Sequence, residues 1–122
     1  MPGNTLIEML NLSGCYAYDL RNKKIIDCDT AGDIPDTISI SLHEGVSEPY
    51  MFVRVTYIFK KGRLARSYMV SDIETATREI KRAFGEEVAF ELLKQALKPG
   101  YSVEELKAKI REIPIPKERE YG

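Results

Sequence analysis

The sequence has no tryptophan, one histidine and only two cysteines in 122 residues. Two cysteines without a CxxC motif and one histidine do not supply the four ligands of a typical structural zinc site. His43 is the only imidazole available to activate a nucleophile, and its polar surroundings favour a surface histidine. No GxGxxG or Walker motif is present to cradle a nucleotide. We therefore expect a binding protein, not an enzyme, with no cofactor.

Long apolar runs are also missing. None approaches the roughly 20 residues that a membrane-spanning helix needs. Residues 1–8 have no basic region and include Glu8 within their apolar stretch, which disfavours a secretion signal and makes the cytoplasm the expected location. The 43% hydrophobic content suffices for one packed core at this length. We expect one domain over residues 1–116 and a charged tail over 117–122.

The apolar spacing predicts an α+β fold: an N-terminal helix, an antiparallel sheet of about five strands, and three C-terminal helices. The expected helices cover 5–12, 71–84, 86–98 and 102–113, and the expected strands cover 15–20, 24–28, 37–42, 51–60 and 63–70. Asn4, Ser71 and Ser102 are the expected helix N-caps. The polar segments 29–36 and 43–49 are predicted to be loops.

The two cysteines lie in the first predicted hairpin. Cys15 and Cys28 are close enough in sequence to pair. With a three-residue turn over 21–23, however, the register that best gathers apolar residues puts the two cysteines on opposite faces. This register favours two small, half-buried thiols over a disulfide. One face of the hairpin would carry Tyr16, Tyr18, Ile26 and Cys28.

Four aspartates in and beside the loop 29–36 superficially resemble a calcium-binding loop. Their spacing does not match the EF-hand pattern, and no glutamate occupies the closing position. We expect no metal there. The four residues are Asp27, Asp29, Asp33 and Asp36.

Charge is segregated along the chain, although the net charge is only −1. Residues 1–48 contain eight acidic and three basic side chains, and residues 72–122 contain eleven acidic and ten basic ones. Residues 49–71 contain five basic side chains and no acidic one. The positive charge is therefore concentrated in one predicted hairpin.

The basic hairpin has two distinct faces if it turns at Lys61 and Gly62. One face is apolar and should meet the helices; it carries Val53, Val55, Tyr57, Phe59, Leu64, Arg66, Tyr68 and Val70. The other face mixes cations with small and apolar side chains; it carries Phe52, Arg54, Thr56, Ile58, Lys60, Arg63, Ala65, Ser67 and Met69.

Such a hairpin suits single-stranded nucleic acid, which needs cations for phosphates and rings or apolar side chains for bases. Tyr57 and Tyr68 would add stacking if the apolar face opens at a cleft. Four or five phosphate contacts would give a salt slope of about −3. The alternative is a solvated sheet face, with Arg66 paired to a helical acid. The predicted binding residues are Phe52, Arg54, Tyr57, Ile58, Lys60, Lys61, Arg63, Arg66 and Tyr68.

Two resemblances accompany this interpretation. The small sheet, the basic hairpin over 54–68, the helical C-terminal segment and a Lys/Arg/Glu-rich composition typical of hyperthermophiles resemble the ThermoDBP-type archaeal single-stranded DNA-binding proteins and their related proteins. That resemblance implies a cleft with a hydrophobic floor and a basic rim, and oligomerisation through helices.

The opening segment, LIEMLNLSGCYAYDLRNKKIIDC over residues 6–28, resembles the start of a roadblock domain. It has a helix followed by a hairpin with an aspartate before the turn. This resemblance implies a dimeric scaffold or a regulator of small GTPases. That family has a helix between its second and third strands, where this sequence predicts the loop 29–36. Both resemblances, and helices in excess of what the sheet needs, predict a homodimer or tetramer; the partner is single-stranded DNA, RNA or an acidic protein.

Overall fold

The structure is a computed structural model that describes residues 5–47 and 50–115, with side chains described for 5–44 and 54–115. The predicted α+β class and the five-stranded antiparallel sheet are confirmed. The elements are α1 (Leu6–Met9), β1 (Gly14–Asp19), β2 (Lys24–Ile26), α2 (Cys28–Ala31), β3 (Asp36–Ser47), β4 (Tyr50–Lys61), β5 (Leu64–Val70), α3 (Ile73–Phe84), α4 (Glu86–Lys94) and α5 (Val103–Glu112).

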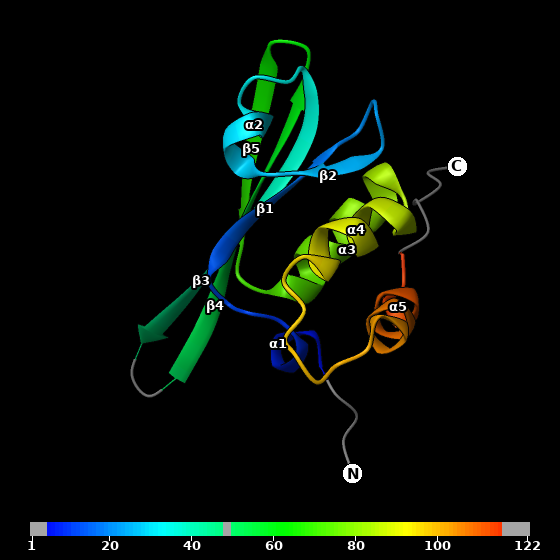
Figure 1. Ribbon diagram of the computed structural model, residues 1–122. Helices are drawn as coiled ribbons and strands as arrows, with labels where there is room; N and C mark the ends of the chain where they lie inside the picture. Colours follow the sequence, from blue (N-terminus) through cyan, green and yellow to red (C-terminus); the bar gives the residue numbers. More distant parts are fainter. Residues whose placement is uncertain (1–4, 48–49, 116–122) are drawn as a thin grey trace, which may run out of the picture.

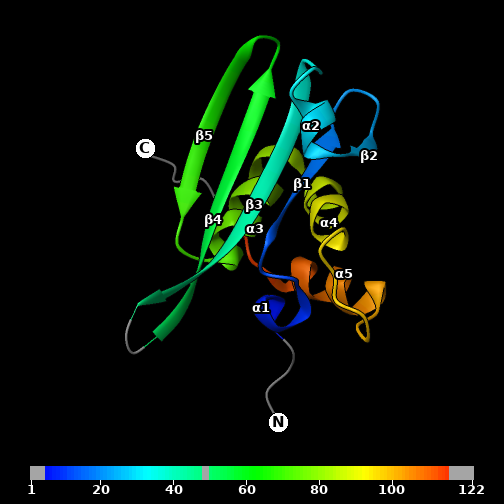
Figure 2. The ribbon, with the colours of Figure 1, turned by 60° about the vertical axis from the view of Figure 1, so that its left-hand side comes forward.

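The strands form one sheet in the order β2-β1-β3-β4-β5. Helices α3, α4 and α5 lie on one face, which we call the inner face (Figure 1). The short helix α2 lies on the opposite, outer face, where it contacts β1 and β3. Among the residues that the structure describes, β5 pairs only with β4, so its other side is a free edge of the sheet (Figure 2).

The core lies between the inner face and the helices. The strand predicted over 37–42 is confirmed within β3, where Ile38, Ile40 and Leu42 share one face and are all fully buried. They pack in one cluster with Ile80 of α3 and Ile110 of α5, among other helical residues. The central apolar residues of the three C-terminal helices are therefore buried within a single chain.

Local signals placed most helix ends correctly. α5 has the predicted N-cap, Ser102, which forms a capping box with Glu105, and α3 ends at Phe84 as predicted. The N-cap of α3 is Asp72 and not Ser71, because the Asp72 carboxylate accepts the hydrogen bond from the Thr75 N–H. Among the described residues, no helix combines the length and the apolar character needed to cross a bilayer.

Two helices are four residues shorter than predicted. α1 begins after Thr5, which forms a capping box with Glu8; the predicted cap at Asn4 lies outside the described residues. α4 ends at Lys94, four residues early. The reason is long-range pairing: the Asn11 N–H donates to the Ala96 carbonyl oxygen at 2.8 Å, which draws the chain after α4 out of the helix.

Both predicted loops contain regular structure. Within 29–36 the chain forms α2, whose N-cap is Asp27 through a hydrogen bond from the Thr30 N–H. The predicted strand 24–28 accordingly ends at Ile26. The segment 43–49 was also predicted wrongly, since β3 continues to Ser47 and pairs with β4 along that length.

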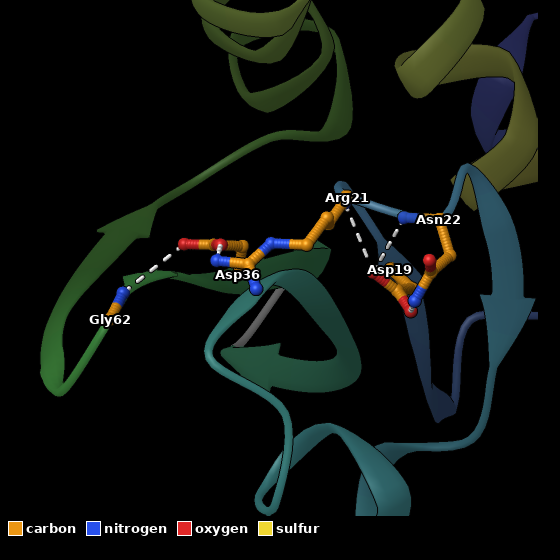
Figure 3. Close-up of polar contacts among 5 residues, drawn as sticks. All are labelled: Asp19, Arg21, Asn22, Asp36 and Gly62. Atoms are coloured by element: carbon orange, nitrogen blue, oxygen red, sulfur yellow. Dashed lines mark hydrogen bonds and ion pairs between the residues drawn. The ribbon is translucent and has the colours of Figure 1, made fainter.

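The first hairpin has a four-residue loop, 20–23, where three residues were predicted. The Asp19 carboxylate holds this loop by accepting hydrogen bonds from the Arg21 and Asn22 N–H groups and from the Asn22 side chain (Figure 3). Lys23 completes the loop with a positive φ of 56°. These contacts fix the register one residue away from the predicted one.

That shift in register determines whether the two cysteines can form a disulfide. β1 and β2 pair through Ala17 and Ile26, so every side chain of the second strand faces the side opposite to the predicted one. Cys15 and Cys28 then lie opposite each other, with Cα atoms 6.2 Å apart, and form a disulfide. The prediction of two separate thiols is wrong because it rested on the register.

Candidate functional site

The basic hairpin turns one residue later than predicted. Lys61 pairs with Leu64, so the turn is Gly62-Arg63. Gly62 has a φ of 58° at the first central position of the turn, as a type II′ hairpin turn requires. The Asp36 carboxylate accepts a hydrogen bond from the Gly62 N–H at 3.2 Å and pairs with Arg21 at 2.5 Å (Figure 3). Asp36 thus ties this turn to the first hairpin.

The later turn moves the register by two residues and so leaves each side chain on its predicted face. Val55 pairs with Val70, and Phe59 pairs with Arg66. The β4 side of the apolar face meets α3 as predicted, because Val55 is fully buried and Phe59 packs edge-on against Phe84 with ring centroids 4.7 Å apart. The β5 side was predicted wrongly, because Leu64, Arg66 and Tyr68 are exposed.

Two tyrosines lie directly opposite each other on this inner face. The rings of Tyr57 and Tyr68 stack with centroids 4.9 Å apart and an interplanar angle of 18°. They differ in accessibility: Tyr57 is 6% exposed, whereas Tyr68 is 40% exposed. Tyr68 therefore presents ring surface to solvent above a buried aromatic support.

The stacked tyrosines lie in a groove between the hairpin and α3, with a volume of about 560 Å³. We call it the tyrosine groove. Its lining residues are Tyr57, Phe59, Tyr68, Glu79, Arg82, Ala83 and Phe84. The floor is aromatic and comes from β4 and β5, while the wall is the last part of α3.

Two charged side chains line the groove, Arg82 and Glu79. Arg82 lines the groove, and Arg66 is exposed on the same face, opposite Phe59. Neither arginine makes an ion pair among the side chains that the structure describes. Glu79 accepts a hydrogen bond from the Tyr57 hydroxyl. Burial, followed by this bond and the Glu79 charge, raises the pKa of Tyr57 well above its usual value, so the phenol stays a neutral donor.

The outer face of the hairpin carries the remaining cations. Arg54 is exposed there beside Met69. Ile58 is also exposed. The Lys60 ammonium donates to the carbonyl oxygen of Gly32 at 2.8 Å, at the end of α2. This cation is therefore engaged by the protein itself.

The nine predicted binding residues do not form one patch. Tyr57, Arg66 and Tyr68 share the inner face, and the outer face carries Arg54, Ile58 and Lys60. Lys61 and Arg63 are exposed at the turn. Phe52 belongs to β4, and its side chain lies outside the described part of the chain.

Sequence reasoning missed the α3 side of the groove. Glu79, Arg82 and Phe84 lie beyond the end of the hairpin, on the following helix, and no local pattern pairs them with it. Ala83 is also exposed and lines the groove. The one available signal was the pair of aromatics, Tyr57 and Phe59, on a face that should meet a helix.

The four aspartates in and beside residues 29–36 do not form a metal-binding cluster. Asp27 caps α2, and Asp36 holds Arg21 and Gly62. Within residues 5–47 and 50–115, no group of three or more His, Cys, Asp or Glu side chains is arranged to hold a metal ion.

Comparisons of the chain with protein-family models, with curated proteins and with solved structures give no match. Function must therefore be inferred from the chemistry of the site.

Proposed function

We propose that this protein binds single-stranded nucleic acid in the tyrosine groove and that it is not an enzyme. The observation that carries the proposal is the exposed ring of Tyr68, stacked on the buried Tyr57 and open to the groove. A base stacks on Tyr68, while Arg66 and Arg82 contact the adjoining phosphates. Every base has a flat π face, so this mode tolerates many sequences.

The dimensions and the chemistry of the groove favour an unpaired base. Its volume lies within the range of about 300–1,000 Å³ that is usual for sites enclosing a small organic group. A base inside a duplex cannot present its face to Tyr68 without leaving the stack. An acidic peptide would use the arginines but would have no need of the stacked rings. Single-stranded DNA and RNA share the required chemistry.

Fluorescence anisotropy with labelled single-stranded DNA and RNA oligonucleotides, measured at about 50 mM salt and above, tests the proposal. Replacing Tyr68 with Ala should weaken binding by roughly 5- to 150-fold, since one base–aromatic stack contributes about 1–3 kcal/mol. Replacing Tyr68 with Phe keeps the ring and should leave binding nearly unchanged. Replacing Arg66 with Gln should lower the steepness of the salt dependence by about 0.7.

An outer-face variant provides the matched control. Arg54 lies on the same hairpin but on the opposite face, so Arg54→Gln should affect binding far less than Arg66→Gln. A larger effect of Arg54→Gln than of Arg66→Gln would indicate that the binding site lies on the outer face. Absence of binding at about 50 mM salt, or full binding by Tyr68→Ala, would contradict nucleic-acid binding in this groove.

A cytoplasmic location is part of the same proposal. Disulfides are rare in most cytoplasmic proteins, but intracellular proteins of hyperthermophiles are rich in them. The disulfide between Cys15 and Cys28 therefore agrees with the hyperthermophile-like composition.

The second candidate function is a roadblock-like dimeric scaffold. One observation favours it: α2 lies between β2 and β3, where that resemblance implies a helix and the sequence predicted only a loop. A scaffold has no need of the exposed Tyr68 ring. The anisotropy experiment therefore separates the two candidates.

A further inference from the structure

Within the described part of the chain, β5 pairs with β4 along one side, and its other side is an open edge of the sheet. Of its seven residues, the six from Leu64 to Met69 are exposed. Two of them are the most exposed large hydrophobic residues among those described: Leu64 at 77% and Met69 at 66%. The strand contains no proline and no acid, and Arg66 is its only charged residue. Natural edge strands usually carry more protection than this against pairing with another chain.

The backbone of β5 is arranged to accept a partner strand. In a two-residue hairpin, Lys61 and Leu64 exchange both backbone hydrogen bonds, and bonded pairs then recur at every second residue. The alternation directs the N–H and C=O groups of Ala65, Ser67 and Met69 away from β4. These groups line the free edge, with Ser67 at the centre of the strand.

We propose that the occupant of this edge is β5 of a second copy of the chain, paired antiparallel about a two-fold axis at Ser67. The argument is the self-complementarity of the strand. A two-fold axis at Ser67 places Leu64 opposite Val70 and Ala65 opposite Met69, so apolar side chains meet apolar side chains. It also places Arg66 opposite Tyr68, a cation beside an exposed ring. No cation lies directly opposite another cation in this register.

The pairing would form about six backbone hydrogen bonds between the chains, two at the central Ser67 pair and two at each flanking pair. It would bury the two most exposed apolar side chains of the protomer. An interface made from one strand per chain is at the small end of specific interfaces. We therefore expect a reversible dimer with a dissociation constant in the micromolar range.

The dimer also changes the tyrosine groove, and this consequence rests on the proposed function. A two-fold axis between antiparallel strands is perpendicular to the sheet, so both inner faces lie on the same side. The two grooves would join over a common floor of β5 strands, with α3 of each chain as the outer walls. Arg66 of each chain would then lie beside Tyr68 of the other and supply a phosphate contact to its site.

Sedimentation-velocity ultracentrifugation without nucleic acid, over roughly 1–200 μM protein, tests the dimer. Ser67→Pro removes the N–H at the axis, which does not pair with β4, and proline is tolerated at such a position of an edge strand. Met69→Lys places a charge on the apolar pair with Ala65. Each variant should weaken dimerisation about tenfold or more. Far-ultraviolet circular dichroism checks that each protomer keeps its fold.

Two matched controls accompany these variants. Ser67→Ala removes the hydroxyl but keeps the N–H, so the dimer should persist. Ile25→Lys introduces the same charge on β2, the opposite edge strand, and should leave dimerisation unchanged. A protein that stays monomeric up to about 200 μM overturns the inference, as does a dimer that survives both β5 variants. Oligonucleotide binding by a strictly monomeric protein would overturn the dimer and leave the proposed function standing.

Discussion

A buried lysine joins the wall of the tyrosine groove to the last helix. Lys81 of α3 is only 5% exposed. Its ammonium donates to the carbonyl oxygens of Ile110 and Ile113, each at 2.6 Å. These acceptors lie at the C-terminal end of α5, where helix carbonyls lack intrahelical partners and the helix dipole is negative. We predict that Lys81→Met destabilises the protein substantially, although methionine keeps most of the apolar stem.

The magnitude follows from the groups left behind. A hydrogen bond that involves a charged group contributes about 1.5–3 kcal/mol, and a buried acceptor without a partner costs about 1–3 kcal/mol. In the variant the Ile110 oxygen still accepts a hydrogen bond from the Ile113 N–H, so the main cost comes from the Ile113 oxygen, which loses the Lys81 donor. Methionine is uncharged, so the variant avoids the desolvation penalty of burying an ammonium group, and this offsets part of the cost. The expected net loss in the free energy of unfolding is about 3 kcal/mol.

Urea unfolding followed by circular dichroism measures this loss. With a denaturant dependence of about 2 kcal/mol per molar, the midpoint should fall by roughly 1.5 M. Lys109→Met is the control, because Lys109 lies on α5 and makes only a 3.6 Å ion pair with the exposed Glu112. That variant should lose no more than about 0.5 kcal/mol. Equal midpoints for the two variants would refute the assigned role of Lys81.

Two further predictions concern the first hairpin. The double variant Cys15→Ala, Cys28→Ala should lose about 3 kcal/mol of unfolding free energy, since the disulfide closes a loop with a sequence separation of 13 residues; a urea midpoint that is insensitive to both the variant and a reducing agent would contradict this. The Asn22 side chain, followed by the Asn22 and Arg21 N–H groups, lowers the pKa of Asp19. The stabilisation from Asp19 is therefore complete above its unfolded pKa of about 3.9 and is lost as the pH falls through the lower folded value. Asp19→Asn should be less stable than the wild type at pH 7, and urea midpoints should converge below about pH 3; a constant difference would exclude this ionisation as the cause.

Local signals in the sequence predicted the elements better than the pairing between them. The strand that contains Ile38, Ile40 and Leu42 and the N-cap at Ser102 depend only on neighbouring residues, and both predictions are confirmed. Register depends on side chains that hold the turns. The hydrogen bonds of the Asp19 carboxylate stabilise a loop one residue longer than predicted. The side chains of β2 therefore lie on the face opposite to the predicted one, and for this reason the disulfide was not predicted. In the second hairpin, Gly62 moved the register by two residues, which kept every side chain on its predicted face.

The same reasoning changes what the positive charge of the hairpin means. Alternation predicted which side chains share a face, but only the path of α3 brings Arg82 to the tyrosines. The five cations of residues 49–71 divide between two faces and the turn, and Lys60 is already engaged by the Gly32 carbonyl. In the proposed binding mode, Arg82 in the groove and Arg66 on the same face contact the phosphates beside Tyr68. Two contacts predict a salt slope of about −1.4 for each site instead of about −3. A steeper measured slope would mean that the strand also follows the outer-face cations, so the slope reports how far along the protein a bound strand extends.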